Sequence, residues 1–193
     1  AFPGSTSNHH LGTQLAMLAA THEMNAFKAP YQRQVLANAR AFAAALAKEG
    51  IPVEGGEAEG YTHTHQVVFR VKPFGDGKEI ATRLERNNIV TNFQALPDDE
   101  TFYHPSGIRT GVSEMTRFGM AEADFAELAR MVADVVLRSK EVGGEVAEYR
   151  KRFSKMRYCL EPEAALRVAP ALFESLFSDR EYFLAFAEAL KGV

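Results

Sequence analysis

The feature that most constrains the fold is a long amphipathic segment that runs from about Tyr31 to Glu49. Its large apolar side chains recur at helical spacing along one stripe, at Tyr31, Val35, Phe42 and Leu46. Gly50 follows at once, and a glycine commonly ends a helix because it adopts the left-handed conformation without strain. The segment therefore predicts one long helix with a buried face, which a further layer of structure must cover.

The flanking segments indicate what that layer is. Residues 10–27 form another helical pattern, which Lys28-Ala29-Pro30 interrupts. After residue 50, short β-branched or aromatic runs alternate with helical ones. We expect strands at 51–53, 65–71, 88–91 and 108–112, and helices at 78–87 and 121–139. This order predicts an α/β protein, in the form of a small α+β domain with helices packed on a sheet.

Composition excludes several classes of protein. The 193 residues are 46% hydrophobic and 24% charged, with a formal net charge of −3, which excludes general disorder and gives no long-range attraction for nucleic acid. No apolar run approaches the roughly 20 residues that span a bilayer, so no membrane partner is expected. The single cysteine, Cys159, cannot form a disulfide within one chain and fits a reducing compartment such as the cytoplasm. The first residues show neither the basic nor the apolar region of a signal peptide, so none is expected there, and they do not include an initiator Met.

Arg109 is the most informative single residue. It lies in Ser106-Gly107-Ile108-Arg109-Thr110-Gly111, between two glycines on a short predicted strand. Its planar guanidinium can hold a carboxylate or a phosphate through two parallel hydrogen bonds. The alternative is a structural arginine that pairs with a core Asp or Glu. The sequence leaves both possibilities open.

A polar turn from Pro3 to Asn8 precedes the first helical segment. Helix N-termini present free N–H groups and a positive dipole, so this turn is a candidate cradle for phosphate. An N-cap made by Ser7 or Asn8 explains the same residues, and is the commoner arrangement.

The remaining candidates favour structural roles. His63 and His65 can share one face of a strand, but no carboxylate or thiolate at recognisable spacing completes a metal site, and we expect no metal. The basic run at 150–157 favours a solvated helix face over nucleic-acid binding, because the chain is acidic overall. No Gly-x-Ser-x-Gly nucleophile motif is present. By themselves, the residues offer an anion-binding arginine and a polar turn without a complete catalytic set.

Four stretches, taken together, resemble the C-terminal portion of serine hydroxymethyltransferase, a pyridoxal-phosphate (PLP) enzyme of the aspartate-aminotransferase fold (fold type I). They are Phe2-Pro3-Gly4, the stretch from Tyr31 to Ala39, the stretch from Asn92 to Pro97, and Ser106 to Gly111 followed by Met115-Thr116 and Gly119-Met120. The resemblance covers roughly residues 1–138. The Ser-Gly-Ile-Arg stretch with its trailing Thr and Gly is its most specific part.

The resemblance implies roles for individual residues. Arg109 would bind the α-carboxylate of an amino-acid substrate, in agreement with the independent interpretation of that residue. Ser7 and Asn8 stand where the family has paired glycines that meet the cofactor phosphate of the neighbouring subunit, which implies a homodimer. Gln94 stands where the family has an Asn that contacts folate, and its longer amide leaves the use of tetrahydrofolate open. The Schiff-base lysine would precede Ala1, so no catalytic residue is assigned within this chain.

The resemblance also implies a division of the chain and a reaction. Residues 1–30 would end the large PLP-binding domain, 31–50 form the interdomain helix, 51–139 the small C-terminal domain and 140–193 a helical extension. With the N-terminal PLP domain, the enzyme would interconvert serine and glycine, or a related β-hydroxy amino acid, through a retro-aldol step at Cα. The alternatives are a folate-independent PLP aldolase or transaldolase, and a catalytically idle domain that assists dimerisation or binds a ligand.

Overall fold

The computed structural model describes residues 10–161, 163–164, 167, 181, 184–185 and 188. The chain divides into two compact units, Met24–Tyr158 and the combination of Ala1–Glu23 with Cys159–Val193. The predicted polar turn at 3–8 and most of residues 162–193 in the predicted helical extension lie outside the described residues. Among the described residues, no helix is long and apolar enough to cross a membrane.

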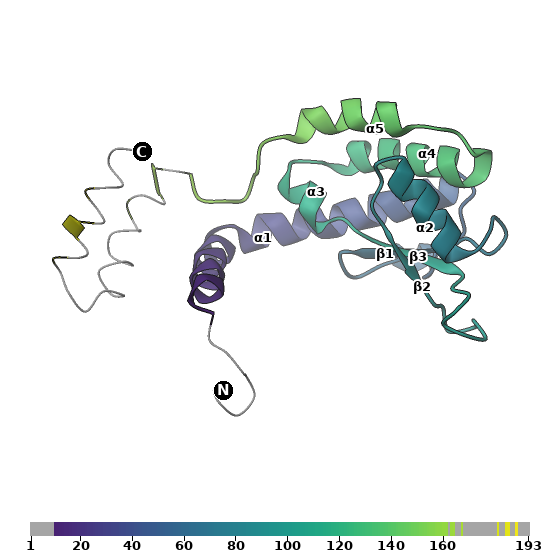
Figure 1. The fold of residues 1–193 in the computed structure, drawn as a ribbon, viewed down its shortest axis with the longest axis horizontal. Coiled ribbons are helices and arrows are strands. Elements are labelled where there is room, and N and C mark those ends of the chain that lie inside the picture. Colours follow the sequence, from purple (N-terminus) through teal and green to yellow (C-terminus); the bar gives the residue numbers. More distant parts are fainter. Residues whose placement is uncertain are drawn as a thin grey trace. The chain divides into compact units, whose positions relative to one another are not determined.

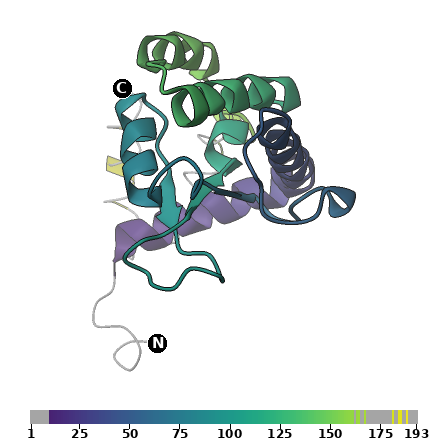
Figure 2. The same cartoon turned by 90° about the vertical axis from the view of Figure 1, so that its right-hand side faces the viewer.

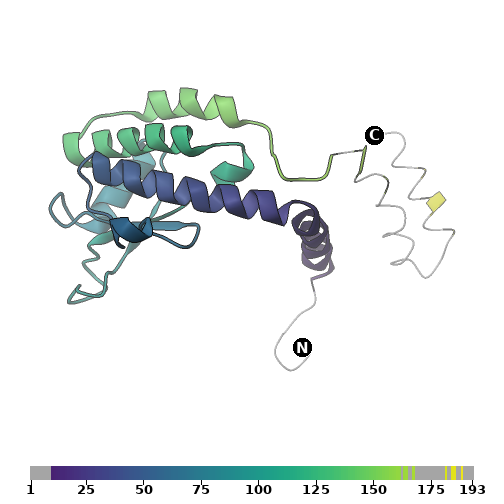
Figure 3. The ribbon, with the colours of Figure 1, turned by 180° about the vertical axis from the view of Figure 1, so that it is seen from behind.

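The unit Met24–Tyr158 is a small antiparallel sheet with helices packed on it (Figure 1). In chain order the elements are α1 (Leu11–Lys48), the 3₁₀ turn η1 (Glu57–Glu59), β1 (Gln66–Arg70), α2 (Gly77–Arg86), β2 (Asn92–Gln94), β3 (Gly107–Gly111), α3 (Ser113–Arg117), α4 (Glu122–Arg138), α5 (Gly143–Arg150) and the 3₁₀ turn η2 (Lys151–Phe153). The sheet has three strands in the order β1-β3-β2, which makes β3 the central strand. Helices gather on one side of it (Figure 2), and α4 lies alongside the C-terminal half of α1, with α5 on its far side (Figure 3).

The core lies between the sheet and the helices. β1 alternates as expected for a half-buried strand, with Val67 and Phe69 buried and the residues between them partly exposed. The buried residues of α1 are Val35, Asn38, Ala39, Phe42, Ala43 and Leu46. The ring of Phe42 packs against that of Phe125 on α4, with 5.7 Å between centroids. The predicted helical stripe is thus confirmed, and Gly50 ends the helix with φ +96° as its position indicated.

The helix break expected at Lys28-Ala29-Pro30 is wrong. α1 runs continuously from Leu11 to Lys48 with Pro30 inside it. An internal proline removes one hydrogen bond and crowds the preceding turn, at a cost of about 3 kcal/mol. In the turns after Pro30 the buried stripe packs against the rest of the unit, and tertiary packing of this kind supplies most of the stability of a protein helix. Packing here overrides the local preference against the helix.

The strand expected at 88–91 is also wrong, and the strand begins instead at Asn92. The N–H groups of Asn88 and Ile89 donate to the carbonyls of Glu85 and Leu84 at 2.9 Å each, so they satisfy the end of α2. Asn88 has φ +63°, the left-handed conformation typical of such helix ends. Backbone groups used in this way are not free for a strand ladder.

The remaining expected elements are confirmed, as β1, β3, α2 and α4. The segment 51–53 pairs more briefly than expected, through a single bridge between Val53 and Phe69. The N–H of Arg70 donates to the carbonyl of Pro52 at 2.8 Å, which suits a residue that accepts but cannot donate a backbone hydrogen bond. The edge of β1 is therefore partly covered.

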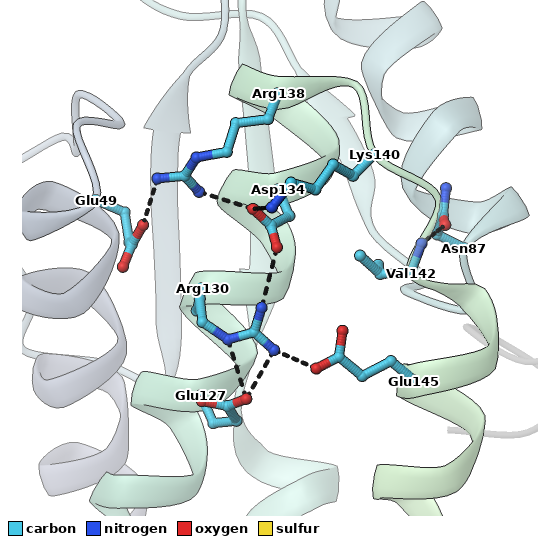
Figure 4. Close-up of polar contacts among 9 residues, drawn as sticks. All are labelled: Glu49, Asn87, Glu127, Arg130, Asp134, Arg138, Lys140, Val142 and Glu145. Atoms are coloured by element: carbon cyan, nitrogen blue, oxygen red, sulfur yellow. Dashed lines mark hydrogen bonds and ion pairs between the residues drawn. The ribbon is translucent and has the colours of Figure 1, made fainter.

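A network of charges centres on Asp134 of α4 (Figure 4). The side chain is 7% exposed and contacts Arg130 at 3.0 Å, Arg138 at 2.9 Å and Lys140 at 3.0 Å. Burial alone would raise the pKa of this carboxyl, but hydrogen bonds from Lys140 and Arg138 hold the pKa of Asp134 below its ordinary value. The carboxylate is therefore charged at neutral pH.

The same network reaches neighbouring elements. Arg130 also bonds to Glu145 of α5, and Arg138 bonds at 3.0 Å to Glu49, just beyond the end of α1. Nearby, the Val142 N–H donates to the buried Asn87 side chain at 2.6 Å, directly before α5 begins. These contacts anchor α5 to α4 and to the end of α2, within the same compact unit as the sheet.

Candidate anion-binding site

Arg109 lies in the middle of the central strand. The register of the sheet pairs it with Val68 of β1 on one side and with Asn92 of β2 on the other. Successive residues of a strand point to opposite faces, and Ile108 points into the core with no exposed surface. The side chain of Arg109 therefore stands on the face of the sheet that points away from the core.

Glycines flank Arg109 on that face. Gly107 and Gly111, two positions before and after it, add no side chain beside the guanidinium. Gly107 is required for a further reason, because a Cβ atom there would lie 2.8 Å from the carbonyl oxygen of Gln94. The Gly-x-Arg-x-Gly spacing thus allows β2 to approach closely and leaves the arginine without neighbours along its own strand.

The other side chains on this face are mostly polar. By the register, they are Gln66, Val68 and Arg70 of β1, and Asn92 and Gln94 of β2. Apart from Arg70 and Arg109 they carry no charge. The strand residues around Arg109 on this face are therefore amides, one valine, glycines and Arg70, and none of them is a carboxylate.

Arg109 has no anionic partner in the described part of the chain. It is half-buried, and no described Asp or Glu pairs with it. Arg70, on the same face, differs in this respect, because it bonds to Glu54 at 2.5 Å and to Asp98 at 2.6 Å. The hydrogen bond from Arg70 in turn lowers the pKa of Asp98. Within the described residues, nothing supports the alternative of a structural ion pair for Arg109.

The connection between β2 and β3 is a loop closed by Asp99. The carboxylate of Asp99 accepts the N–H groups of Leu96 and Ser106 at 2.8 Å each, and so joins the two ends of the loop. Ser106 and the two N–H groups favour the charged form and lower the pKa of Asp99 to about 2. The tip presents Phe102 and Tyr103, each 87% exposed. The clasp fixes Ser106, the residue directly before β3, and so fixes where the strand begins, two residues before Arg109.

Two of the predicted site residues, Arg109 and Gln94, share this face. Gln94 lies opposite Gly107, two residue pairs from Arg109, and its amide nitrogen donates to the carbonyl of Ala95 at 3.2 Å. Ser7 and Asn8 lie outside the described residues. Their expected contact with a cofactor phosphate stays a prediction.

The histidines and the basic run are used within the fold. His63 lies 3.3 Å from the guanidinium of Arg40, and precedes the strand that it was expected to share with His65. In the described part of the chain, no group of three or more His, Cys, Asp or Glu is placed to hold a metal. Within the basic run, Arg150 stacks on Phe118 at 4.6 Å and Arg152 on Tyr149 at 4.9 Å.

Asn92 lies directly opposite Arg109, although the sequence alone assigned it no role of its own. Its position opposite Arg109 depends on the register between β2 and β3, which a single sequence does not reveal. The polar-apolar-polar order of Asn92-Phe93-Gln94 is the signal that indicates a half-exposed strand. That signal is only three residues long, and the more apolar run before it obscured it.

A cavity of about 600 Å³ lies elsewhere, toward the helices. Its lining includes apolar residues of α4 and α5, among them Phe125, Val132 and Val146, and it includes Thr110 and Gly111 of β3 but not Arg109. Thr110 neighbours Arg109 and points to the opposite face of the strand. This cavity therefore lies mainly on the core side of the sheet, and Arg109 does not line it.

The arrangement matches a solved enzyme structure. It is similar to that of L-threonine transaldolase from Pseudomonas fluorescens in its internal aldimine state, with a TM-score of 0.75 and 32% sequence identity, over 86% of this chain and 39% of that one. The fold is thus the C-terminal part of a fold type I PLP enzyme, as the resemblance implied, with a small sheet whose central strand carries Arg109.

Sequence comparison identifies the family within this class. The family model for serine hydroxymethyltransferase matches residues 1–132, and the chain belongs to that family. It is 46% identical to serine hydroxymethyltransferase of Pyrobaculum arsenaticum over 159 residues, which are 81% of this chain and 37% of that protein. It is 43% identical to that of Korarchaeum cryptofilum over 167 residues, 83% of this chain and 38% of that protein.

The chain spans little more than a third of the length of these relatives. A match over 81% of the chain extends beyond α5 wherever it begins, so α5 lies within the part that is shared with the Pyrobaculum protein.

Proposed function

We propose that this chain is the C-terminal part of a PLP-dependent enzyme that interconverts serine and glycine, in which Arg109 binds the α-carboxylate of the amino acid. The observation that carries the proposal is the half-buried guanidinium on the central strand, flanked by glycines and without an anionic partner among the described residues. A carboxylate suits that group, because it accepts two parallel N–H bonds from one guanidinium.

Arg109 would also select the bond that reacts. A carboxylate held at two points cannot rotate relative to the strand, so the other substituents of Cα take fixed directions. Bound PLP supplies the electron sink for the charge that develops at Cα. The rigid position of Arg109 in the middle of a hydrogen-bonded sheet suits this orienting role.

The cofactor contacts and the assembly are proposed on the resemblance. Ser7 and Asn8 would meet the cofactor phosphate of the neighbouring subunit in a homodimer, through backbone N–H groups and their side chains. The rest of the enzyme would supply the Schiff-base lysine. The single Cys159 supports a reducing location such as the cytoplasm.

A second candidate reaction is aldol exchange without folate. Gln94 in place of the expected Asn supports it, and the similar solved structure is that of a transaldolase. We favour hydroxymethyl transfer because the relatives that share over 40% identity carry that name.

The role of Arg109 is tested by substitution in the full-length enzyme. Arg109→Ala should raise the KM for serine by at least about 10-fold, since each hydrogen bond to a charged group is worth roughly 1.5–3 kcal/mol. The KM of Arg109→Lys should lie between those of the wild type and Arg109→Ala, because lysine keeps the charge but lacks the planar guanidinium. Arg86→Ala, at an exposed arginine on α2, is the matched control and should leave the KM unchanged. An unchanged KM in Arg109→Ala would contradict the assignment.

The products distinguish the two candidate reactions, hydroxymethyl transfer with tetrahydrofolate and aldol exchange without folate. Glycine formed from serine only when tetrahydrofolate is present supports hydroxymethyl transfer. A new β-hydroxy amino acid formed from threonine and an added aldehyde, without folate, supports aldol exchange. An enzyme that contains the lysine and catalyses neither reaction would support the idle domain.

A further inference from the structure

Two stretches that the sequence marked out, residues 31–39 and 115–120, meet inside the core. Asn38 of α1 and Thr116 of α3 are both completely buried, at 0% exposure. A buried amide without partners is costly, so the contacts of Asn38 need a full account. Neither residue lies on the face that carries Arg109.

The amide of Asn38 is satisfied on both sides. Its Nδ2 donates to Thr116 Oγ1 at 2.8 Å and to the carbonyl of Met120 at 2.9 Å. Its Oδ1 accepts from Gln34 Nε2 at 2.9 Å, one turn earlier on α1. Both donor hydrogens and one acceptor position are used, which fixes the orientation of the amide. One side chain of α1 thus holds both α3 and the turn after it.

Thr116 links Asn38 to the end of the strand that carries Arg109. Its hydroxyl donates to the carbonyl of Val112 at 2.7 Å, and its N–H donates to the same oxygen at 3.0 Å. Val112 directly follows β3 and stands three residues after Arg109. A second contact acts nearby, since the hydroxyl of Tyr31 donates to the carbonyl of Ser113 at 3.1 Å. The end of β3 is therefore bonded to α1 at defined points.

Hydrogen bonds and apolar contacts differ in what they fix. Apolar packing between α1 and the sheet is non-directional and tolerates small slides. A buried, fully satisfied polar network favours one arrangement, because any slide leaves a donor unpaired. Such a slide at Val112 would carry Arg109 with it, since a strand paired on both sides moves as a unit.

We propose that Asn38 and Thr116 are positioning residues that hold Arg109 in register with α1. The inference rests on the proposed role of Arg109 in binding the substrate carboxylate. α1 is the helix that leads into this domain along the chain, so the network joins the placement of that helix to the placement of the guanidinium. Loss of the Thr116 hydroxyl would leave the guanidinium of Arg109 present but less precisely positioned.

The experiment uses the full-length, cofactor-loaded enzyme with glycine as the probe. Thr116→Val keeps the shape but lacks the hydroxyl, and it should raise the calorimetric Kd for glycine and the KM for serine by roughly 3- to 10-fold. The value of kcat should change less. Thr116→Ser should restore both constants. Thr82→Val is the matched control, because Thr82 makes the same type of bond to a carbonyl one turn earlier, at 2.9 Å, on α2.

A double variant separates positioning from general damage. In an Arg109→Ala background, Thr116→Val should cause no further rise in the Kd for glycine, because the network acts through Arg109. An equal rise in both backgrounds, or none in the single variant, would overturn the positioning role. If Arg109→Ala itself leaves the Kd unchanged, the proposed function fails instead. Should Thr116→Val not fold, Tyr31→Phe gives the same comparison, and no change in its Kd would count against the proposal.

Discussion

At the scale of single residues, two arginines on one face of the sheet have opposite surroundings. Arg70 lies between Glu54 and Asp98, and its charge is neutralised within the domain. Arg109 lies two positions away across the register, opposite an asparagine. An amide at that position leaves the guanidinium free for an external anion, whereas a carboxylate there would compete with it. The identity of Asn92 therefore matters as much as that of Arg109.

Asn92→Asp should convert Arg109 into a second internally paired arginine. Side chains directly opposite on neighbouring strands have Cβ atoms about 4.5–5.5 Å apart, within reach of an ion pair. We expect the KM for serine to rise by about 10-fold or more, through competition for the guanidinium. Asn92→Ala is the control, since it removes the amide without adding a charge. Steady-state kinetics of both variants check this, and an equal effect of Asp and Ala would contradict the competition.

At the scale of elements, helical periodicity predicted more than strand patterns did. The stripe of α1 and the helical pattern of α4 are long enough for their spacing to identify both helices, and each helix buries one face. Ile89 and Val90 look like part of a strand, yet Ile89 completes the end of α2 and Val90 is 84% exposed. A helix end and a short strand share the same apolar residues, and only the backbone hydrogen bonds distinguish them.

Only the part of the candidate site that is local in sequence was predictable. The glycines around Arg109 marked it as a candidate for binding an anion, because they are local in sequence, but the sequence left a structural ion pair equally open. The amides beside it come from another strand, and their placement needs a register that a single sequence does not contain. The same holds for Asn38 and Thr116, which are 78 residues apart and meet only in the fold.

The anchoring of α5 provides a prediction at this scale. Asp134→Asn leaves Arg130, Arg138 and Lys140 without the carboxylate that they share. Their partly exposed positions reduce the loss, which we expect to be about 1–2 kcal/mol. The readout is local, as faster amide hydrogen exchange in residues 143–150 of the full-length protein. Because the pKa of Asp134 is lowered in the folded protein, the anchoring holds above the ordinary pKa of Asp and is lost as the pH falls through the lowered value.

Glu148→Gln is the control for this prediction. Glu148 lies on α5 itself, but its pair with Lys151 is exposed on both sides, at 75% and 72%. Exposed pairs contribute little to stability, so exchange in α5 should stay unchanged. Equal exchange rates in the Asp134 and Glu148 variants would show that the buried carboxylate does not hold the helix.

At the scale of the whole molecule, the face of the sheet that carries Arg109 depends on a small part of the chain. The buried hydrophobic cluster runs from Val35 to Phe153, all within the unit Met24–Tyr158. The network from Asn38 to Val112 and the charges around Asp134 lie inside the same limits. This unit therefore contains its own core, its own polar contacts and the Arg109 face. The segment after Tyr158 contributes none of the described contacts that position Arg109.

Truncation of the full-length enzyme tests this division. A variant that ends after Tyr158 should keep the KM for serine and the affinity for glycine, because every described contact around Arg109 remains. A variant that ends after Ser139 should fail in both, since it also removes Val146 and Phe153, which pack in the core, and Glu145, which pairs with Arg130. Loss of a core side chain of this size typically lowers the free energy of unfolding by about 2–5 kcal/mol, which is a large part of the stability of a small domain. A raised KM in the variant that ends after Tyr158 would mean that the segment after Tyr158 acts at the site. An unchanged KM in the variant that ends after Ser139 would mean that α5 does not support the sheet.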